Sequence, residues 1–304
     1  MVKSYSMATA IRSRPIPMLI PQRPRQRHYK TPRPQSDPGF SIAARAVMIG
    51  GQRHAIARRW RLEIVGSADS EATRRSLHDF LAEHPTIRAQ PVRSASFRLG
   101  ADLSRSAAST GDRSPSISAL PGFVVLAVGT LEPRKNYEVL LDAMDKLSPA
   151  QSVSLLIVGK VGWSCQGVVQ RIAQHPLRGT RIFHFDDADD GELLAAYRRA
   201  DCLVCASWAE GFGLPVVEGL FHGLPVIASD IAVFREIGED HCRYFPAGDA
   251  SGLAQQILAV AREQPKRAPA RADIDTLCPS WLESTRQFKD ATFAIAADAC
   301  GGPP

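Results

Sequence analysis

The sequence predicts an α/β fold in which a Rossmann-like parallel sheet is flanked by helices. From Gly122 onward, short apolar runs alternate with amphipathic helical patterns, which is typical of such a sheet. The chain has 304 residues, of which 44% are hydrophobic, enough for a sizeable core. A chain of this length commonly forms about two domains. No apolar stretch reaches the roughly 20 residues needed to span a bilayer.

The apolar runs and cap residues place the elements of this sheet. Buried strands are predicted at residues 123–128, 153–158, 181–185, 202–206 and 225–228. Helices are predicted after the caps Asn136 and Asp249, around residues 168–173, over residues 190–199, and from Pro215 to just before Gly223. The main domain therefore covers residues 121–262.

The rest of the chain divides into four segments. Residues 1–60 are basic and rich in Pro and Arg, which predicts disordered or irregular chain. Residues 61–103 contain a strand-helix-strand pattern and form an incomplete N-terminal α/β piece. Residues 104–120 are a linker rich in Ser and Gly. Residues 263–304 form a second linker, a C-terminal helix that Ser280 can cap, and a tail.

The charge is unevenly distributed. Residues 1–120 hold 20 Lys and Arg against 8 Asp and Glu, a net +12, whereas residues 121–304 hold 17 against 23, a net −6. The basic character thus belongs to an arm attached to an ordinary domain, and no nucleic-acid partner is expected. The arm allows a peripheral contact with the inner face of a membrane. We expect a cytoplasmic location, where the six cysteines would stay reduced.

Cys202 and Cys205 form a C-x-x-C pattern inside an apolar run. On a strand, positions i and i+3 point to opposite faces, which opposes a metal ion shared by the two thiols. No second ligand pair follows at the spacing that a zinc site needs. We therefore expect structural burial rather than a redox or metal site.

A loop with two cations follows the first strand of the main domain. Gly129 allows a flexible start, and Arg134 and Lys135 lie just before a helix N-terminus. Ligands of open α/β sheets bind at the carboxyl ends of strands, and Arg and Lys beside free backbone N–H groups suit a diphosphate. The alternative is a solvated surface turn.

A second loop carries two carboxylates, Glu210 and Glu218, around a helix start. Gly211 and Gly213 allow close approach of the backbone to a ligand, and carboxylates accept hydrogen bonds from sugar hydroxyls. We expect Glu218 in the first turn of the helix, facing the same crevice as the cations. The alternative for Glu218 alone is an acid that complements the helix dipole.

Several segments in register resemble the group-one glycosyl transferases, which have the GT-B fold and an E-x7-E signature. They are residues 129–136, 156–163, 192–197, 201–218 and 223–235, within a region of resemblance over 123–260. By this resemblance, Arg134 and Lys135 bind the donor diphosphate, and Glu210 binds the donor sugar. These three are the expected catalytic residues.

The resemblance also implies the remaining donor-binding residues. Glu218 would bind the ribose, and the backbone at Phe212, Gly213 and Leu214 would lie near sugar and phosphate, beside Gly129. The expected function is transfer of a hexose from a nucleoside diphosphate sugar to an acceptor hydroxyl in polysaccharide biosynthesis. The acceptor would be a saccharide or lipid-linked, and retention at the anomeric carbon follows from the resemblance alone. No cofactor or metal is expected.

Two departures leave other functions open. Residues 67–83 and 97–103 resemble the end of the family's acceptor domain more weakly, and residues 1–60 match no part of it. Asp186 stands where the family commonly has glycine. One alternative is a truncated, catalytically weak or inactive nucleotide-sugar-binding protein. Another is an interaction protein whose basic arm recruits an acidic partner or a membrane.

Asp187 and Asp189 form a D-x-D pattern, which binds metal in the other major glycosyltransferase fold. Asp189 precedes a predicted helix, where capping and the helix dipole already favour acids. We therefore expect capping rather than metal binding. His222 lies near the expected crevice, but its position at a helix end favours a structural role.

Overall fold

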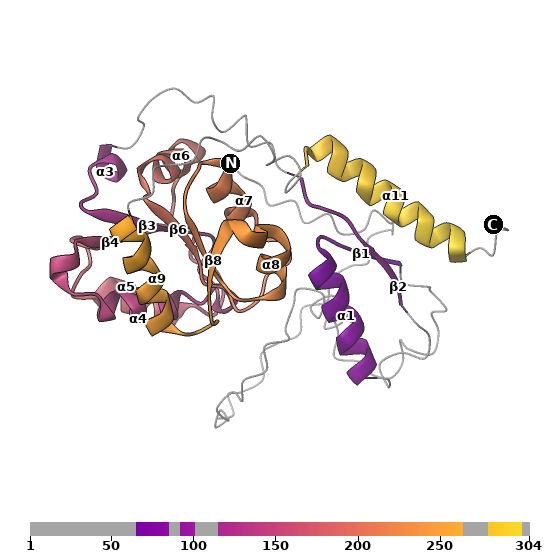
Figure 1. Cartoon of the computed structure of the whole chain (residues 1–304), viewed down its shortest axis with the longest axis horizontal. Coiled ribbons are helices and arrows are strands. Elements are labelled where there is room, and N and C mark those ends of the chain that lie inside the picture. Colours follow the sequence, from indigo (N-terminus) through magenta and orange to yellow (C-terminus); the bar gives the residue numbers. More distant parts are fainter. Residues whose placement is uncertain (1–64, 85–91, 101–114, 264–278, 300–304) are drawn as a thin grey trace, which may run out of the picture. The chain divides into compact units, whose positions relative to one another are not determined.

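The computed structural model describes residues 65–84, 92–100, 115–263 and 279–299 (Figure 1). Within residues 115–263 lies a parallel sheet in the order β5-β4-β3-β6-β7-β8. Its strands are β3 (Phe123–Val128), β4 (Val153–Val158), β5 (Ile182–Phe185), β6 (Cys202–Cys205), β7 (Val226–Ser229) and β8 (Cys242–Phe245). The predicted α/β class is confirmed.

Helices cover both faces of this sheet (Figure 1). Along β3, Val124 and Leu126 belong to one core layer, and Val125 and Ala127 to the other. The first layer packs against α3 (Pro115–Ser118), α6 (Asp190–Arg199), α7 (Leu214–Phe221) and α8 (Ala232–Gly238). The second packs against α4 (Tyr137–Lys146), α5 (Gln166–Gln174) and α9 (Ala250–Glu263). Strand runs buried on both sides explain why the sequence shows continuous apolar stretches.

Cys202 and Cys205 confirm the prediction made from their spacing. Both thiols are free and buried, and they lie in opposite core layers of the sheet. Burial raises the pKa of each thiol above its ordinary value, so neither is poised as a nucleophile.

The strand order places a topological switch point between β3 and β6. From β3 the chain proceeds outward through β4 and β5, then returns to place β6 on the other side of β3 and continues to β8. At such a point the loops leaving two neighbouring strands diverge to opposite faces, which opens a crevice at their carboxyl ends. The loops that leave β3 and β6 carry the predicted site residues.

The N-terminal piece is a parallel pair of β1 (Val65–Ala68) and β2 (Arg93–Ser96), connected through α1 (Glu71–Glu83). The predicted strand-helix-strand pattern is thus confirmed. The C-terminal helix α11 (Trp281–Ala299) contacts both strands. Phe97 meets Phe288 edge to face at 5.2 Å, and the Arg98 backbone N–H donates to Gln287 Oε1 at 3.2 Å. Sequence reasoning predicted this helix but not its packing.

Some boundaries differ from the predictions. Helix α7 begins at Leu214, so Pro215 is its second residue and Glu218 lies beyond the first turn. Asn136 precedes α4 as predicted, but its side chain makes no capping hydrogen bond. The elements α8 and β8 were not predicted, and neither was α3, which lies in the predicted linker 104–120. Residues 1–60, most of the linker 104–120, residues 264–278 and the tail 300–304 lie outside the described residues.

In the described part of the chain, no helix is both long enough and apolar enough to cross a membrane.

Candidate donor-binding site

The loop after β3 folds back over the end of the sheet. Gly129 has φ 137°, a conformation that favours glycine, and its carbonyl accepts a hydrogen bond from the Tyr137 hydroxyl at 2.5 Å. The loop then forms a short 3-10 turn, Pro133–Lys135, before α4 begins. This turn holds Arg134 and Lys135 at the switch point. A Cβ built on Gly129 would lie 3.5 Å from Lys135 Nζ, so the ammonium group lies over this glycine.

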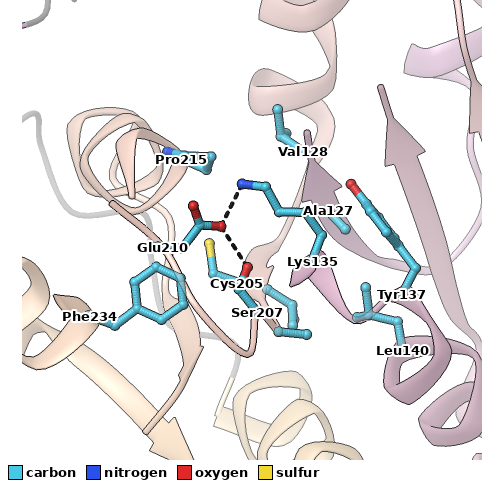
Figure 2. A pocket seen from close by; sticks show the side chains of 12 residues that line it. Ala127, Val128, Lys135, Tyr137, Leu140, Cys205, Ser207, Glu210, Pro215 and Phe234 are labelled. Carbon is cyan, nitrogen blue, oxygen red and sulfur yellow. Dashed lines mark hydrogen bonds and ion pairs between the residues drawn. The ribbon is translucent and has the colours of Figure 1, made fainter. Parts of the chain in front are cut away.

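Glu210, in the loop after β6, joins the two cations. Lys135 Nζ lies 2.6 Å from Glu210 Oε1, and Arg134 Nη1 pairs with Glu210 Oε2. The Ser207 hydroxyl donates to the same Oε1 at 2.7 Å. Figure 2 shows Lys135 and Ser207 converging on the Glu210 carboxylate in a pocket that Tyr137, Pro215 and Phe234 also line. The predicted catalytic residues Arg134, Lys135 and Glu210 are therefore brought together.

These contacts keep Glu210 ionised although its side chain is only 6% exposed. Burial by itself raises the pKa of Glu210, but Lys135 and Arg134 more than offset this effect. The pKa of Glu210 therefore lies below its ordinary value. On the other side of the turn, Arg134 Nε lies 2.6 Å from Glu132 Oε1, which anchors the guanidinium between two carboxylates.

The segment after Glu210 forms the start of α7. Phe212 is buried, and Gly213 adopts φ 94° at the N-cap position before Leu214. A Cβ at Gly213 would lie 2.8 Å from Phe234 Cε1, so only glycine fits without movement. The predicted donor-binding residues Phe212, Gly213 and Leu214 thus form one tight turn beside the Glu210 carboxylate.

Glu218 lies on α7, one to two turns into the helix. The Tyr197 hydroxyl of α6 donates a hydrogen bond to Glu218 Oε2 at 2.5 Å. Burial raises the pKa of Glu218 above its ordinary value, an effect that the Tyr197 hydrogen bond and the charge of Lys135 only partly offset. The charge of Lys135 lowers the pKa of both acids. Glu218 is not among the residues that line the pocket at Glu210, so its predicted place in the crevice of the cations stays a prediction.

Comparison with known proteins identifies the family of this chain. The model of a family described as "Glycosyl transferases group 1" matches residues 112–273, more than half of the chain. The chain belongs to the group 1 glycosyl transferases. The resemblance inferred from the sequence is confirmed.

Two curated relatives illustrate the match. This group 1 glycosyl transferase is 36% identical to the serotype-specific mannosyltransferase WbdA of Escherichia coli over 179 residues, which is 56% of this chain and 22% of the relative. It is 31% identical to a phosphatidyl-myo-inositol mannosyltransferase of Mycobacterium leprae over 218 residues, 68% of this chain and 48% of the relative. The chain thus spans between about a fifth and a half of these relatives.

Solved structures support the GT-B architecture. The structure of Anabaena Alr3699/HepE in complex with UDP and glucose matches with a TM-score of 0.58 and 20% identity, covering 74% of this chain and 61% of that one. The sucrose-phosphate synthase of Thermosynechococcus elongatus matches with a TM-score of 0.57 and 24% identity, covering 78% and 60%. At this identity the likeness shows the fold alone.

The N-terminal piece of this group 1 glycosyl transferase contacts the loop after β6. The hydroxyls of Ser70 and Thr73 donate to the Gly211 carbonyl at 2.6 and 3.0 Å. The Glu236 carboxylate of α8 accepts hydrogen bonds from the backbone N–H groups of Glu71 and Ala72, at the N-terminus of α1. The turn that follows Glu210 is therefore held from outside the sheet domain.

Asp189 of the D-x-D pattern caps a helix, as predicted. Asp189 is the N-cap of α6, with a reciprocal capping box to Glu192. The described residues contain no cluster of three or more His, Cys, Asp or Glu with the spacing of a metal site. His222 lies at the C-cap of α7, as its sequence position suggested, and its ring also stacks on Tyr197.

Several site residues were missed by sequence reasoning. Ser207 contacts Glu210, and Glu132 pairs with Arg134. Each lies within three residues of its partner in the sequence, so a search of the neighbouring polar residues could have found both. Tyr197 is different, because it lies on another helix and reads as an ordinary apolar-face residue. Only the packing of α6 against the first core layer reveals its contact with Glu218.

Proposed function

We propose that this chain binds a nucleoside diphosphate sugar and transfers its hexose to an acceptor hydroxyl with retention at the anomeric carbon. The observation that carries the proposal is the convergence of Arg134 and Lys135 on Glu210 at the switch point of the sheet. Cations beside a helix start suit a diphosphate, and a charged carboxylate suits sugar hydroxyls. The relatives named above are mannosyltransferases, so mannose is the first sugar to test.

The chemistry asked of these residues is stabilisation of the leaving group. As the bond from the anomeric carbon to the diphosphate breaks, its electron pair leaves with the diphosphate, and Arg134 and Lys135 offset the charge that develops there. Glu210 holds the sugar so that the acceptor hydroxyl attacks from the same face that the diphosphate leaves, as retention requires. The acceptor hydroxyl forms the new bond to the anomeric carbon, and its proton passes to the departing diphosphate. Retention is supported by family membership rather than by a positioned nucleophile.

The acceptor and the cellular setting belong to the same proposal. One relative is named a phosphatidyl-myo-inositol mannosyltransferase, and another is named a serotype-specific mannosyltransferase. We infer a saccharide or lipid-linked acceptor, reached from the cytoplasm, with the basic residues 1–60 making a peripheral contact with the inner face of the membrane. Binding of the chain to vesicles with and without anionic lipid would test this contact.

The binding step is tested by isothermal titration calorimetry with GDP-mannose, UDP-glucose, GDP and UDP. The double variant Arg134→Ala/Lys135→Ala should weaken binding of the preferred ligand at least a hundredfold, since each charge-assisted contact is worth about 1.5–3 kcal/mol. Arg171→Ala is a matched control, because Arg171 pairs with the α4 acids Glu138 and Asp142 instead. Unchanged affinity in a folded double variant would remove the diphosphate assignment.

The transfer step needs a separate assay, the release of nucleoside diphosphate from the preferred donor with and without a saccharide acceptor. Acceptor-dependent release that Arg134→Ala/Lys135→Ala abolishes would support the enzyme. Tight donor binding without release, even with cell extract added, would instead support the alternative of a nucleotide-sugar-binding protein.

A further inference from the structure

Tyr197 connects two side chains of α7. Its hydroxyl donates to Glu218 Oε2 at 2.5 Å, and its ring stacks on His222 with centroids 4.8 Å apart and planes inclined by 21°. Glu218 and His222 lie four residues apart and so share one face of the helix. The phenol of α6 therefore contacts the ribose-binding candidate and the residue one turn beyond it.

The phenol cannot easily move. Tyr197 is 2% exposed and packs in the first core layer with Leu203, Val217 and Leu220. Burial raises the pKa of Tyr197 well above its ordinary value, and the nearby charge of Glu218 raises it further. At neutral pH the hydroxyl thus keeps its proton and donates a hydrogen bond to the carboxylate. A fixed donor on one carboxylate oxygen restricts rotation of the whole group.

We propose that Tyr197 is a positioning residue for the nucleotide ribose: by engaging Oε2 it orients the Glu218 carboxylate so that Oε1 accepts a ribose hydroxyl. The inference rests on the proposed function, in which Glu218 binds the ribose. It adds a residue of helix α6, outside the loops after β3 and β6. His222 supports the arrangement by covering one face of the phenol.

The experiment measures ribose recognition separately from diphosphate binding. Affinities of wild type and Tyr197→Phe are determined by calorimetry for UDP and GDP, for their 2′,3′-dideoxy counterparts, and for inorganic pyrophosphate. In Tyr197→Phe the ratio of ribo to dideoxy affinity should fall about tenfold, the effect of losing one hydrogen bond to a charged group. Pyrophosphate affinity should stay unchanged, because Arg134 and Lys135 are untouched.

Tyr244→Phe is the matched control. The Tyr244 hydroxyl donates to the backbone carbonyls of Phe234 and Glu239. The variant Tyr244→Phe therefore also removes the hydrogen bonds of a tyrosine hydroxyl, but none of them involves Glu218. Its ratio of ribo to dideoxy affinity should equal that of wild type. If Tyr197→Phe does not fold, His222→Ala provides a second variant, with a smaller fall in the same ratio because the phenol loses its stacked neighbour.

Three results would overturn the inference. They are an unchanged ratio in folded Tyr197→Phe, an equal loss for all ligands including pyrophosphate, and a wild type that does not discriminate ribo from dideoxy nucleotides. Failure of the proposed function looks different, since the wild type would then bind neither nucleotide more tightly than pyrophosphate. A wild type with ribose discrimination that survives Tyr197→Phe would leave the proposed function standing.

Discussion

Lys135 and Glu210 form a 2.6 Å ion pair that joins the loop after β3 to the loop after β6. In the proposed function the two residues bind different parts of the donor, Lys135 the diphosphate and Glu210 the sugar. Their pairing shows that both groups reach one point of the crevice. It also means that neither can be changed without affecting the charge balance of the other, because both side chains are largely buried.

The first prediction concerns this ion pair. Lys135→Met should lower the free energy of unfolding by about 1–3 kcal/mol, because a buried carboxylate loses one of its charged partners. Adding Glu210→Gln should recover much of this loss, since the remaining groups are then neutral or separately paired. Urea denaturation of the two single variants and the double variant measures the coupling. Strictly additive effects would show that the pair contributes little to stability.

The second prediction is that the two acids of the signature respond oppositely to pH. The folded pKa of Glu210 is lowered, so its stabilising contribution is present above the ordinary value of 4.5 and is lost as the pH falls below it. The folded pKa of Glu218 is raised, so folding becomes less favourable as the pH rises above 4.5.

Unfolding free energies of Glu210→Gln and Glu218→Gln, each relative to wild type and followed from pH 3 to 7.5, check this difference. The stability of Glu210→Gln relative to wild type should fall with rising pH, with the change below about 4.5. That of Glu218→Gln should rise, with the change above about 4.5. Parallel curves for the two variants would contradict the assigned environments.

The third prediction compares two glycines. Gly213→Ala should destabilise the protein by about 1–3 kcal/mol, because the position has φ 94° and the new Cβ would lie 2.8 Å from Phe234 Cε1. Gly167→Ala, on α5, should stabilise it by about 0.5–1 kcal/mol, since no atom lies within 4 Å of the new Cβ and alanine favours helix. Thermal unfolding measures both, and equal effects would contradict the strained turn.

The fourth prediction separates capping from metal binding. Asp189→Ala should cost about 1 kcal/mol of stability by removing the α6 cap, with no effect on nucleoside diphosphate affinity. Asp187→Ala, two residues away, should change neither quantity. Titrations in EDTA should give the same affinity as titrations without it. Loss of binding in EDTA that manganese restores would instead favour the D-x-D pattern as a metal site.

The fold was predictable where burial is strongest. Strands β3 and β4 match their predicted ranges because the four central positions of β3 and every position of β4 are buried, which leaves two runs that are apolar apart from Ser154. The strand β8 was missed because Arg243 and Tyr244 are only partly buried, which weakens the apolar pattern. Helix α8 is seven residues long, too short for a clear periodicity.

The site was predictable to the extent that its residues are charged and follow strands. Arg134, Lys135 and Glu210 stand in loops at the carboxyl ends of β3 and β6, and parallel strands bring such ends to one edge. The pairing of Tyr197 with Glu218 could not be predicted in the same way. It depends on the packing of α6 against α7, which helical periodicity alone does not specify.

The position of β6 beside β3 has a consequence for folding. The cations follow the first strand of the sheet domain and the carboxylate follows the fourth, so the crevice forms only when a crossover through β4 and β5 has been completed. Local unfolding of β3 to β5 or of β6 to β8 should abolish binding, because each group of strands supplies part of the crevice. A bound ligand should stabilise both groups together by mass action. Hydrogen exchange with a tight ligand should therefore slow across β3 and β6 in concert, which makes ligand binding a reporter of cooperativity in the whole domain.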